Sequence, residues 1–183
     1  GDERTGLTTM LMNEGMDTGD ILLQQEEPIT EEDDAISLSR RLAVAGASLL
    51  LQTVRGLEKN LLVPQPQNGS LASSAPPLKK EEGLIDWTKS AREIHNLIRG
   101  TVPWPGAFTH LDRKRLKILK SALSEGRIQA QPGTVVRAGP EGIQVVTGGG
   151  YLTLTEVQPE NRSRMQAWEF ISGHALPAGT RLG

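Results

Sequence analysis

The stretch from Pro64 to Pro77 constrains the fold of this chain more than any other feature. It consists mainly of Pro, Gln, Ser, Asn and Gly with almost no large apolar residue, a composition typical of a linker. We therefore expect one part over residues 1–63, a linker over residues 64–82, and a second part over residues 83–183. With only two Phe, one Tyr and three Trp among 183 residues, two modest cores are more plausible than one large aromatic core.

Before the linker, two strand-like runs flank a glycine-rich loop. Residues 7–12 are apolar or β-branched, and the apolar residues 21–23 follow the loop Asn13–Asp20. Short runs of this kind, bounded by Gly and Asp, predict two strands joined by a tight connection.

The loop allows both a structural and a functional interpretation. Gly15 and Gly19 supply the backbone angles of a sharp turn, and the side chains of Asp17 and Asp20 can hydrogen-bond their own backbone. Asp17-Thr18-Gly19 is also the triplet at the catalytic carboxylate of aspartic proteases, but those enzymes bring two triplets together so that two carboxylates share a proton. The chain has one copy, so we disfavour an aspartic protease.

A long helix is predicted after the second strand, which we expect to end at Pro28. Thr30 and Asp33 have the spacing of a capping box, and acidic residues fill the first turn, where the helix dipole favours them. An apolar stripe with helical spacing, which we expect to pack on the sheet, consists of Ile36, Ala43, Ala47, Leu50, Val54, Leu57 and Leu61.

After the linker, the sequence predicts a helix from about Thr88 to Arg99. Its expected apolar side consists of Ala91, Ile94, Leu97 and Ile98. The segment Pro103–Gly106 forbids continuation of the helix and fixes a turn around Trp104. We expect Trp104 to fill a core, with a stacking platform for a nucleobase as the alternative.

The remainder of the chain has β character. Five short runs are broken by turn residues, at 107–111, 116–123, 133–137, 142–147 and 151–157. We expect turns at Asp112-Arg113, at Gly139-Pro140 and at Gly148–Gly150. Five strands of this length suggest a small closed barrel of the oligonucleotide-binding (OB) type. A last helix is expected from about Ser163, capped by the spacing to Gln166, to Gly173.

Charge is distributed unevenly along the chain. Residues 1–78 hold five Lys or Arg against twelve Asp or Glu, a balance of −7, whereas residues 79–183 hold fifteen against ten, a balance of +5. A basic second part is typical of a polyanion-binding protein. The chain has no Cys, which excludes disulfides and thiolate metal sites, and it has no apolar run of membrane-spanning length. We therefore expect a soluble, cytoplasmic protein.

Several stretches resemble the methionyl-tRNA formyltransferase family in the same order. Residues 14–22 (EGMDTGDIL) resemble the end of that family's catalytic domain, and residues 85–87 (IDW), 103–107 (PWPGA) and 142–145 (GIQV) resemble its later part. The similarity covers nearly the whole chain. Its most specific parts are the Asp17 loop and the Pro-Trp-Pro-Gly block.

The resemblance implies a fold and a reaction. The fold is an α/β remnant of a Rossmann-like formyltransferase domain, followed by a small OB-like five-stranded β-barrel domain that binds tRNA. The reaction moves a formyl group from the co-substrate 10-formyltetrahydrofolate to the amino group of methionyl initiator tRNA. Such a site must stabilise an oxyanion and remove a proton from nitrogen.

Roles for individual residues are also implied by the resemblance. Asp17 is expected to be catalytic, together with an Asn and a His that family members carry in an N-terminal half. Asn13, Glu14, Gly15 and Met16 would border the folate pocket, and no metal is needed. The expected partners are initiator methionyl-tRNA and the folate, without a membrane and with a monomeric full-length protein. Candidates for binding tRNA phosphates are Lys79, Lys80, Lys89, Arg92, Arg99, Lys114, Arg115 and Lys117.

Because no Asn and His at the family's spacing precede Asp17, we expect the chain to be a C-terminal portion that is inactive alone. A hairpin and one helix would then expose an apolar face, so we expect dimerisation, aggregation or fraying before Pro64. Two alternatives stay open. One is a sister enzyme that formylates an amino sugar nucleotide, or a formyl-folate hydrolase or dehydrogenase domain. The other is a non-catalytic RNA-binding barrel.

Overall fold

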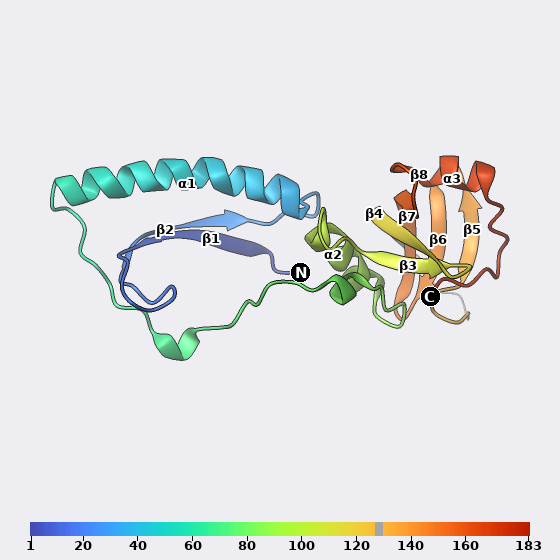
Figure 1. Cartoon of the computed structure of the whole chain (residues 1–183), viewed down its shortest axis with the longest axis horizontal. Coiled ribbons are helices and arrows are strands. Elements are labelled where there is room, and N and C mark those ends of the chain that lie inside the picture. Colours follow the sequence, from blue (N-terminus) through green and yellow to red (C-terminus); the bar gives the residue numbers. More distant parts are fainter. Residues whose placement is uncertain (127–129) are drawn as a thin grey trace. The chain divides into compact units, whose positions relative to one another are not determined.

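The computed structural model describes residues 1–126 and 130–183. Contacts divide the chain into two compact units: the N-unit, residues 2–77, and the C-unit, residues 78–183 together with residue 1 (Figure 1). Among the described residues, no helix combines the length and the apolar character that a membrane span requires.

The N-unit is built on a β-hairpin. Strands β1 (Arg4–Met10) and β2 (Ile21–Pro28) pair antiparallel, with Arg4 opposite Pro28 and Met10 opposite Ile21. The two predicted strands are confirmed, and β2 ends at Pro28 as predicted. β1 starts and ends earlier than the predicted run over residues 7–12. It starts earlier because Arg4 already pairs with Pro28, the last residue of β2, and its pairing becomes irregular between Thr9 and Met10. Figure 1 shows the helix α1 lying along this hairpin.

Helix α1 (Ala35–Glu58) begins later than predicted. Its N-cap is Asp34, whose Oδ1 accepts hydrogen bonds from the backbone N–H groups of Ile36 (2.9 Å) and Ser37 (2.7 Å). The backbone N–H of Asp34 in turn donates to Ser37 Oγ at 3.1 Å, which completes a capping box. The predicted box at Thr30 and Asp33 was therefore wrong.

Asp33 instead ties the end of the hairpin to the second turn of α1. Its side chain is only 6% exposed, and its two carboxylate oxygens accept hydrogen bonds from the Arg41 guanidinium at 2.8 and 2.7 Å. The Thr30 N–H donates to the same carboxylate at 2.8 Å. These bonds, that of Arg41 first, hold the pKa of Asp33 well below its usual range.

The face of α1 that packs on the hairpin differs from the predicted stripe. Its buried residues are Leu49 and Thr53, and Thr53 Oγ1 lies 2.8 Å from Thr9 Oγ1 on β1. Most of the predicted stripe is exposed, namely Ala43, Ala47, Leu50, Val54, Leu57 and Leu61. The prediction was wrong because α1 carries apolar residues on both faces, and the sequence spacing alone does not say which face meets the hairpin.

After α1 the chain returns to the hairpin. Ile21 and Gln65 exchange two backbone hydrogen bonds, at 2.8 and 2.9 Å. The short 3₁₀ helix η1 (Gly69–Leu71) follows. The first residues of the expected linker therefore lie against the start of β2.

The C-unit begins with the 3₁₀ helix η2 (Lys80–Gly83) and the helix α2 (Ala91–Thr101). Ser90 is the N-cap of α2, and it forms a capping box with Glu93. The helix starts later than predicted because Asp86 first closes a turn, accepting the Lys89 N–H at its carbonyl. The predicted apolar side is confirmed: Ala91, Ile94 and Ile98 are buried and Leu97 is half-buried.

An antiparallel sheet, with strands of different lengths, forms most of the rest of the C-unit. Its strands are β3 (Phe108–Leu111), β4 (Lys114–Ser124), β5 (Val135–Gly139), β6 (Gly142–Thr147), β7 (Gly150–Pro159) and the short β8 (Met165–Gln166). They pair antiparallel in the order β3-β4-β7-β6-β5, with β8 added to β7. The five predicted runs are thus confirmed as strands. The Asp112-Arg113 turn is also confirmed, with φ of 49° and 66° as a two-residue hairpin connection requires.

The predicted closed barrel is not found among the described residues, where β3 and β5 are the two ends of the pairing path. The C-terminal segment, residues 179–183, lies between these two strands instead. Val135 at the start of β5 donates to the Thr180 carbonyl at 2.8 Å, and the Gly183 N–H donates to the His110 carbonyl on β3 at 2.9 Å. The tail therefore takes up hydrogen bonds that direct pairing of the two strands would use.

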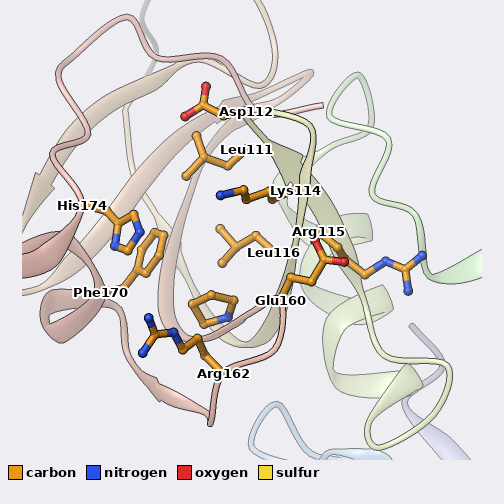
Figure 2. Close-up of a pocket in the computed structure, with 10 residues that line it drawn as sticks. Leu111, Asp112, Lys114, Arg115, Leu116, Glu160, Arg162, Phe170 and His174 are labelled. Atoms are coloured by element: carbon orange, nitrogen blue, oxygen red, sulfur yellow. The ribbon is translucent and has the colours of Figure 1, made fainter.

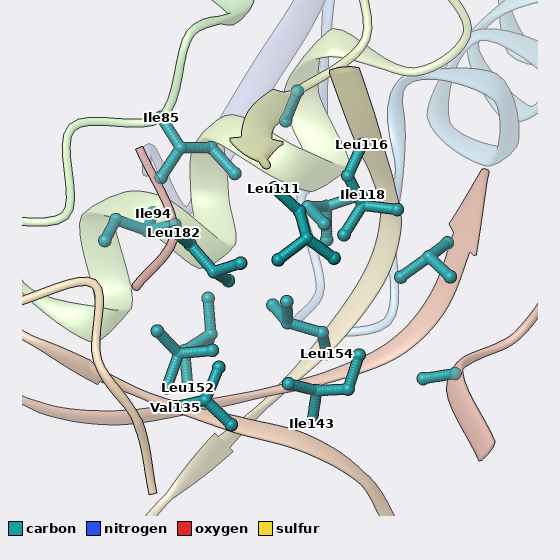
Figure 3. Packing of buried hydrophobic residues seen from close by; sticks show 14 of the residues in the cluster. Ile85, Ile94, Leu111, Leu116, Ile118, Val135, Ile143, Leu152, Leu154 and Leu182 are labelled. Atoms are coloured by element: carbon teal, nitrogen blue, oxygen red, sulfur yellow. The ribbon is translucent and has the colours of Figure 1, made fainter. Parts of the chain in front are cut away.

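The core of the C-unit lies between the sheet and the helices α2 and α3, and Figure 3 shows part of it. Ile118, Ile143, Leu152 and Leu154 from the strands are fully buried. Trp87 is 5% exposed, and its Nε1–H donates to Thr109 Oγ1 at 3.0 Å, which satisfies the polar atom of the buried ring.

Two further predictions in the C-unit were wrong. Trp104 is 60% exposed and does not fill a core, whereas Trp87 is buried. The last helix, α3 (Ala167–Gly173), is capped by Gln166 with Glu169 and not by Ser163. The residues before it are extended because β8 pairs with β7.

Candidate functional site

The loop between β1 and β2 is closed by the backbone at its base. The Leu11 N–H donates to the Asp20 carbonyl at 2.9 Å. Gly19 lies so close to Leu11 that a Cβ at residue 19 would be 1.6 Å from the Leu11 carbonyl oxygen. Only glycine fits this position without a backbone shift, so the tight base of the loop depends on it.

Asn13 organises the interior of the loop. Its Oδ1 accepts hydrogen bonds from the Gly15 N–H at 3.1 Å and from Thr18 Oγ1 at 2.9 Å. The expected role of Asp17 and Asp20 in bonding the backbone locally is therefore taken by Asn13. Asn has the same side-chain acceptor and the same tendency to form such turns.

Asp17 sits at the exposed side of the loop with φ of 54°, a left-handed conformation that is uncommon for residues other than Gly, Asn and Asp. Within residues 1–126 and 130–183, no hydrogen bond or ion pair reaches its carboxylate. The carboxylate is therefore available to an external partner.

The expected folate-pocket residues share this exposed position. Asn13, Glu14, Gly15 and Met16 are all exposed, and the side chains of Met12 and Met16 are 93% and 89% exposed. Met12 and Met16 therefore add exposed apolar surface to the loop that carries the Asp17 carboxylate.

Sequence reasoning missed one residue that contacts this loop. Gln67, in the expected linker, donates from Nε2 to the carbonyl oxygens of Asp17 (2.8 Å) and Gly19 (2.7 Å). A Gln in a Pro-, Gln- and Ser-rich segment carried no signal for this role, because the contact spans 50 residues of sequence.

All of the expected tRNA-binding cations belong to the C-unit. Lys79 and Lys80 lie at the start of η2, Lys89 precedes α2, and Arg92 and Arg99 are on α2. Lys114, Arg115 and Lys117 follow one another along β4. The structure thus distributes them over three neighbouring elements of one unit.

A pocket of about 230 Å³ lies where the β3–β4 turn meets α3 (Figure 2). It is lined by Leu111, Asp112, Lys114, Arg115, Leu116, Pro159, Glu160, Arg162, Phe170 and His174. Two of the expected cations, Lys114 and Arg115, meet there with Arg162 and His174, which we had not included. Arg162 was visible in the sequence as part of a basic run before the last helix, but His174 carried no signal.

Aromatic rings stand beside the cations of this pocket. The rings of Phe170 and His174 stack with their centres 4.7 Å apart, and the Arg115 guanidinium lies 4.5 Å from the centre of the Phe108 ring. Phe108 and Phe170 are both buried, so the cations are what this pocket offers to a nucleic acid, and they suit its phosphates. The cavity is smaller than the sites that enclose whole small molecules, so a single nucleotide group fits it better than a complete ligand.

A buried carboxylate orders the basic segment next to this pocket. Glu156 on β7 is 3% exposed, and it contacts Arg164 Nε at 2.6 Å and Lys120 Nζ at 3.6 Å. Arg164 and Lys120 are therefore held by ion pairs with Glu156, whereas Arg162 lines the pocket.

Comparison with known proteins identifies related sequences along the whole chain. The sequence model described as formyl transferase matches residues 1–54, and that of the formyl transferase C-terminal domain matches residues 77–175. A methionyl-tRNA formyltransferase of Syntrophus aciditrophicus is 50% identical over all 183 residues, which cover 59% of that protein. One of Thermodesulfovibrio yellowstonii is 46% identical over 98% of the chain, which is 57% of that protein. The chain thus spans a little more than half the length of these relatives.

Solved structures share the fold at low sequence identity. HypX from Aquifex aeolicus in complex with tetrahydrofolic acid superimposes with a TM-score of 0.68 at 18% identity, covering 93% of this chain and 30% of that one. An N-formyltransferase from Helicobacter canadensis, in complex with folinic acid and dTDP-3-aminofucose, gives 0.65 at 22% identity, covering 86% and 56%. The sequence matches over both units, together with this shared fold, show that the chain belongs to the formyl transferase family.

Proposed function

We propose that these residues form the later part of a methionyl-tRNA formyltransferase. The enzyme would transfer the formyl group of 10-formyltetrahydrofolate to the amino group of methionine on initiator tRNA. The observation that carries the proposal is the Asp17 loop, which presents an unpartnered carboxylate on a tightly built hairpin. Relatives that bear this name match the chain over its whole length.

Asp17 is the group of this chain that we assign to the chemistry. When an amine attacks a formyl carbonyl, the nitrogen must lose a proton, and a carboxylate can accept it directly or through a neighbouring imidazole. The absence of a protein partner for Asp17 among the described residues fits a carboxylate that is completed by an Asn and a His from an N-terminal half. The bound folate supplies the formyl group, and Asn13 to Met16 would border its pocket.

The C-unit would hold the tRNA. Its balance of basic residues, the exposed Trp104 and the pocket lined by Lys114, Arg115 and Arg162 support this role. We also retain an OB-like architecture as part of the proposal, because the C-terminal segment bridges the strands at the two ends of the sheet. A nucleic-acid role explains why cations and aromatic rings occur together in this unit.

The role of Asp17 is tested in the full-length enzyme, that is, these 183 residues together with the N-terminal part that the relatives carry. We expect Asp17→Asn to lower the formyl transfer rate at least about a hundredfold, the lower end of a general acid–base contribution. Glu32→Gln, at another exposed carboxylate of the N-unit, is the matched control and should keep the rate. An Asp17→Asn enzyme with the parental rate would remove Asp17 from the mechanism.

Binding of tRNA is tested on the 183-residue chain. Affinity for initiator tRNA, measured across a salt series beside an unrelated tRNA, should fall linearly on logarithmic axes with a slope equivalent to several phosphates. No binding at low salt would favour the sister reaction on an amino sugar nucleotide. Tight tRNA binding by a full-length protein that transfers no formyl group would favour a non-catalytic RNA-binding module.

A further inference from the structure

We propose that Gln67 is a positioning residue that clamps the Asp17 loop, an inference that rests on the proposed role of Asp17. Its Nε2 donates to the carbonyl oxygen of Asp17 at 2.8 Å and to that of Gly19 at 2.7 Å. A primary amide has two N–H groups, so one side chain satisfies both acceptors at once. The two carbonyls belong to the residues on either side of Thr18, in the loop that presents the carboxylate.

The loop needs such a clamp because its own hydrogen bonds hold other parts of it. Asn13 fixes Gly15 and the Thr18 hydroxyl, and the Leu11–Asp20 bond closes the base. The Asp17 carboxylate itself has no partner within the described residues, so its direction is set by the backbone alone. That backbone is in the left-handed region, which Asp adopts more readily than most L-residues, and the Gln67 bond to the Asp17 carbonyl helps to hold it there.

Gln67 is held in place from both sides. Two residues before it, Gln65 exchanges two backbone hydrogen bonds with Ile21 at the start of β2. One residue after it, Asn68 caps η1, since its Oδ1 accepts from Ser70 N–H at 3.1 Å. The segment after α1 is therefore anchored to the hairpin and to its own turn, and Gln67 extends from it to the loop.

The clamp connects two parts of the N-unit that are far apart in sequence. A segment whose composition is typical of a linker thereby fixes the catalytic loop. We infer that residues 64–68, at the start of this segment, help to set the geometry of the site. Lengthening the chain between Val63 and Gln65 would weaken the clamp as Gln67 substitutions do.

Activity of full-length variants tests the catalytic consequence. Gln67→Ala removes the amide, and Gln67→Glu keeps its shape but places a carboxylate against two carbonyl oxygens. Loss of two neutral hydrogen bonds to the loop should lower kcat by about ten- to a hundredfold. The KM for methionyl-tRNA should stay within about twofold, since Gln67 belongs to the N-unit and the candidate tRNA-binding cations belong to the C-unit. Gln65→Ala is the matched control, because Gln65 acts through its backbone.

A second measurement reports on the loop without any activity. Hydrogen–deuterium exchange of the peptide covering residues 13–20 should be faster in Gln67→Ala and Gln67→Glu than in the parent and in Gln65→Ala. Parental exchange in both Gln67 variants would overturn the clamp. Faster exchange with unchanged kcat would overturn its catalytic role.

The two measurements also separate this inference from the function on which it rests. If Asp17→Asn is fully active, the proposed role of Asp17 fails whatever the exchange shows. If Asp17→Asn is inactive while both Gln67 variants keep kcat, the proposed function stands and the positioning role of Gln67 is refuted.

Discussion

Substitution of Gly19 is the sharpest structural perturbation of the proposed site. In Gly19→Ala the new Cβ would lie 1.6 Å from the Leu11 carbonyl oxygen, whereas ordinary contacts begin at 3.4 Å. Residue 19 and Leu11 must therefore move apart by well over 1 Å. The atom that clashes with the new Cβ is a backbone oxygen, so no side-chain rotation relieves the overlap.

The expected magnitude follows from that displacement. The Leu11–Asp20 and Gln67–Gly19 hydrogen bonds are stretched, and Asp17 moves with the loop. Misplacement of a catalytic group by about 1 Å costs on the order of a hundredfold in rate. We therefore expect Gly19→Ala to lower kcat/KM for formyl transfer by about a hundredfold in the full-length enzyme.

A steady-state transfer assay with methionyl initiator tRNA measures this effect. Gly69→Ala is the matched control, because a Cβ at residue 69 meets nothing within 4 Å. All three Trp residues lie in the C-unit, so an unchanged urea transition in Trp fluorescence would show that the C-unit is intact. A Gly19→Ala enzyme within about threefold of the parent would refute the claim that loop geometry positions Asp17.

Three further outcomes are expected. Arg41 is the main group that holds the pKa of Asp33 low. The ionised Asp33 carboxylate therefore stabilises the native state above the unfolded pKa of about 4, and this stabilisation is lost as the pH falls below about 4. Asp33→Asn should therefore lower stability at pH 7 by about 1–3 kcal/mol and flatten its acid dependence, as urea titrations followed by helix circular dichroism can show. Arg162→Gln should weaken tRNA binding and reduce the salt slope by about one, and an unchanged slope would exclude Arg162 from the interface. The isolated chain should self-associate through the exposed face of α1, and Leu50→Lys with Val54→Lys should make it monomeric in sedimentation. Undiminished self-association of this double variant would exclude that face as the interface.

Local sequence signals predicted most elements of the fold. The hairpin turn at Asp112-Arg113 and the buried side of α2 were predictable because each depends on neighbouring residues. The buried face of α1 was not predictable, because Leu49 and Leu50 are equally apolar and only the hairpin decides which one it covers. The exposure of Trp104 was likewise not predictable, because composition and spacing do not say which Trp the folded core covers.

The candidate site was predictable only where it is local. The Asp17 loop is one continuous motif, so its residues could be named from the sequence. Gln67 could not be named, because its contact with the loop depends on the return of the chain after α1. Arg162 and His174 likewise reach one pocket with Lys114 only after α3 and the β3–β4 turn come together.

We propose that this chain serves formyl transfer to methionyl-tRNA. The most direct test offers the full-length enzyme 10-formyltetrahydrofolate with either methionyl initiator tRNA or an amino sugar nucleotide, and measures kcat/KM for each. We predict efficient transfer to the tRNA, abolished by Asp17→Asn, and negligible transfer to the sugar nucleotide. Preferential formylation of the sugar nucleotide would contradict the proposed substrate, and transfer that survives Asp17→Asn would contradict the proposed role of Asp17.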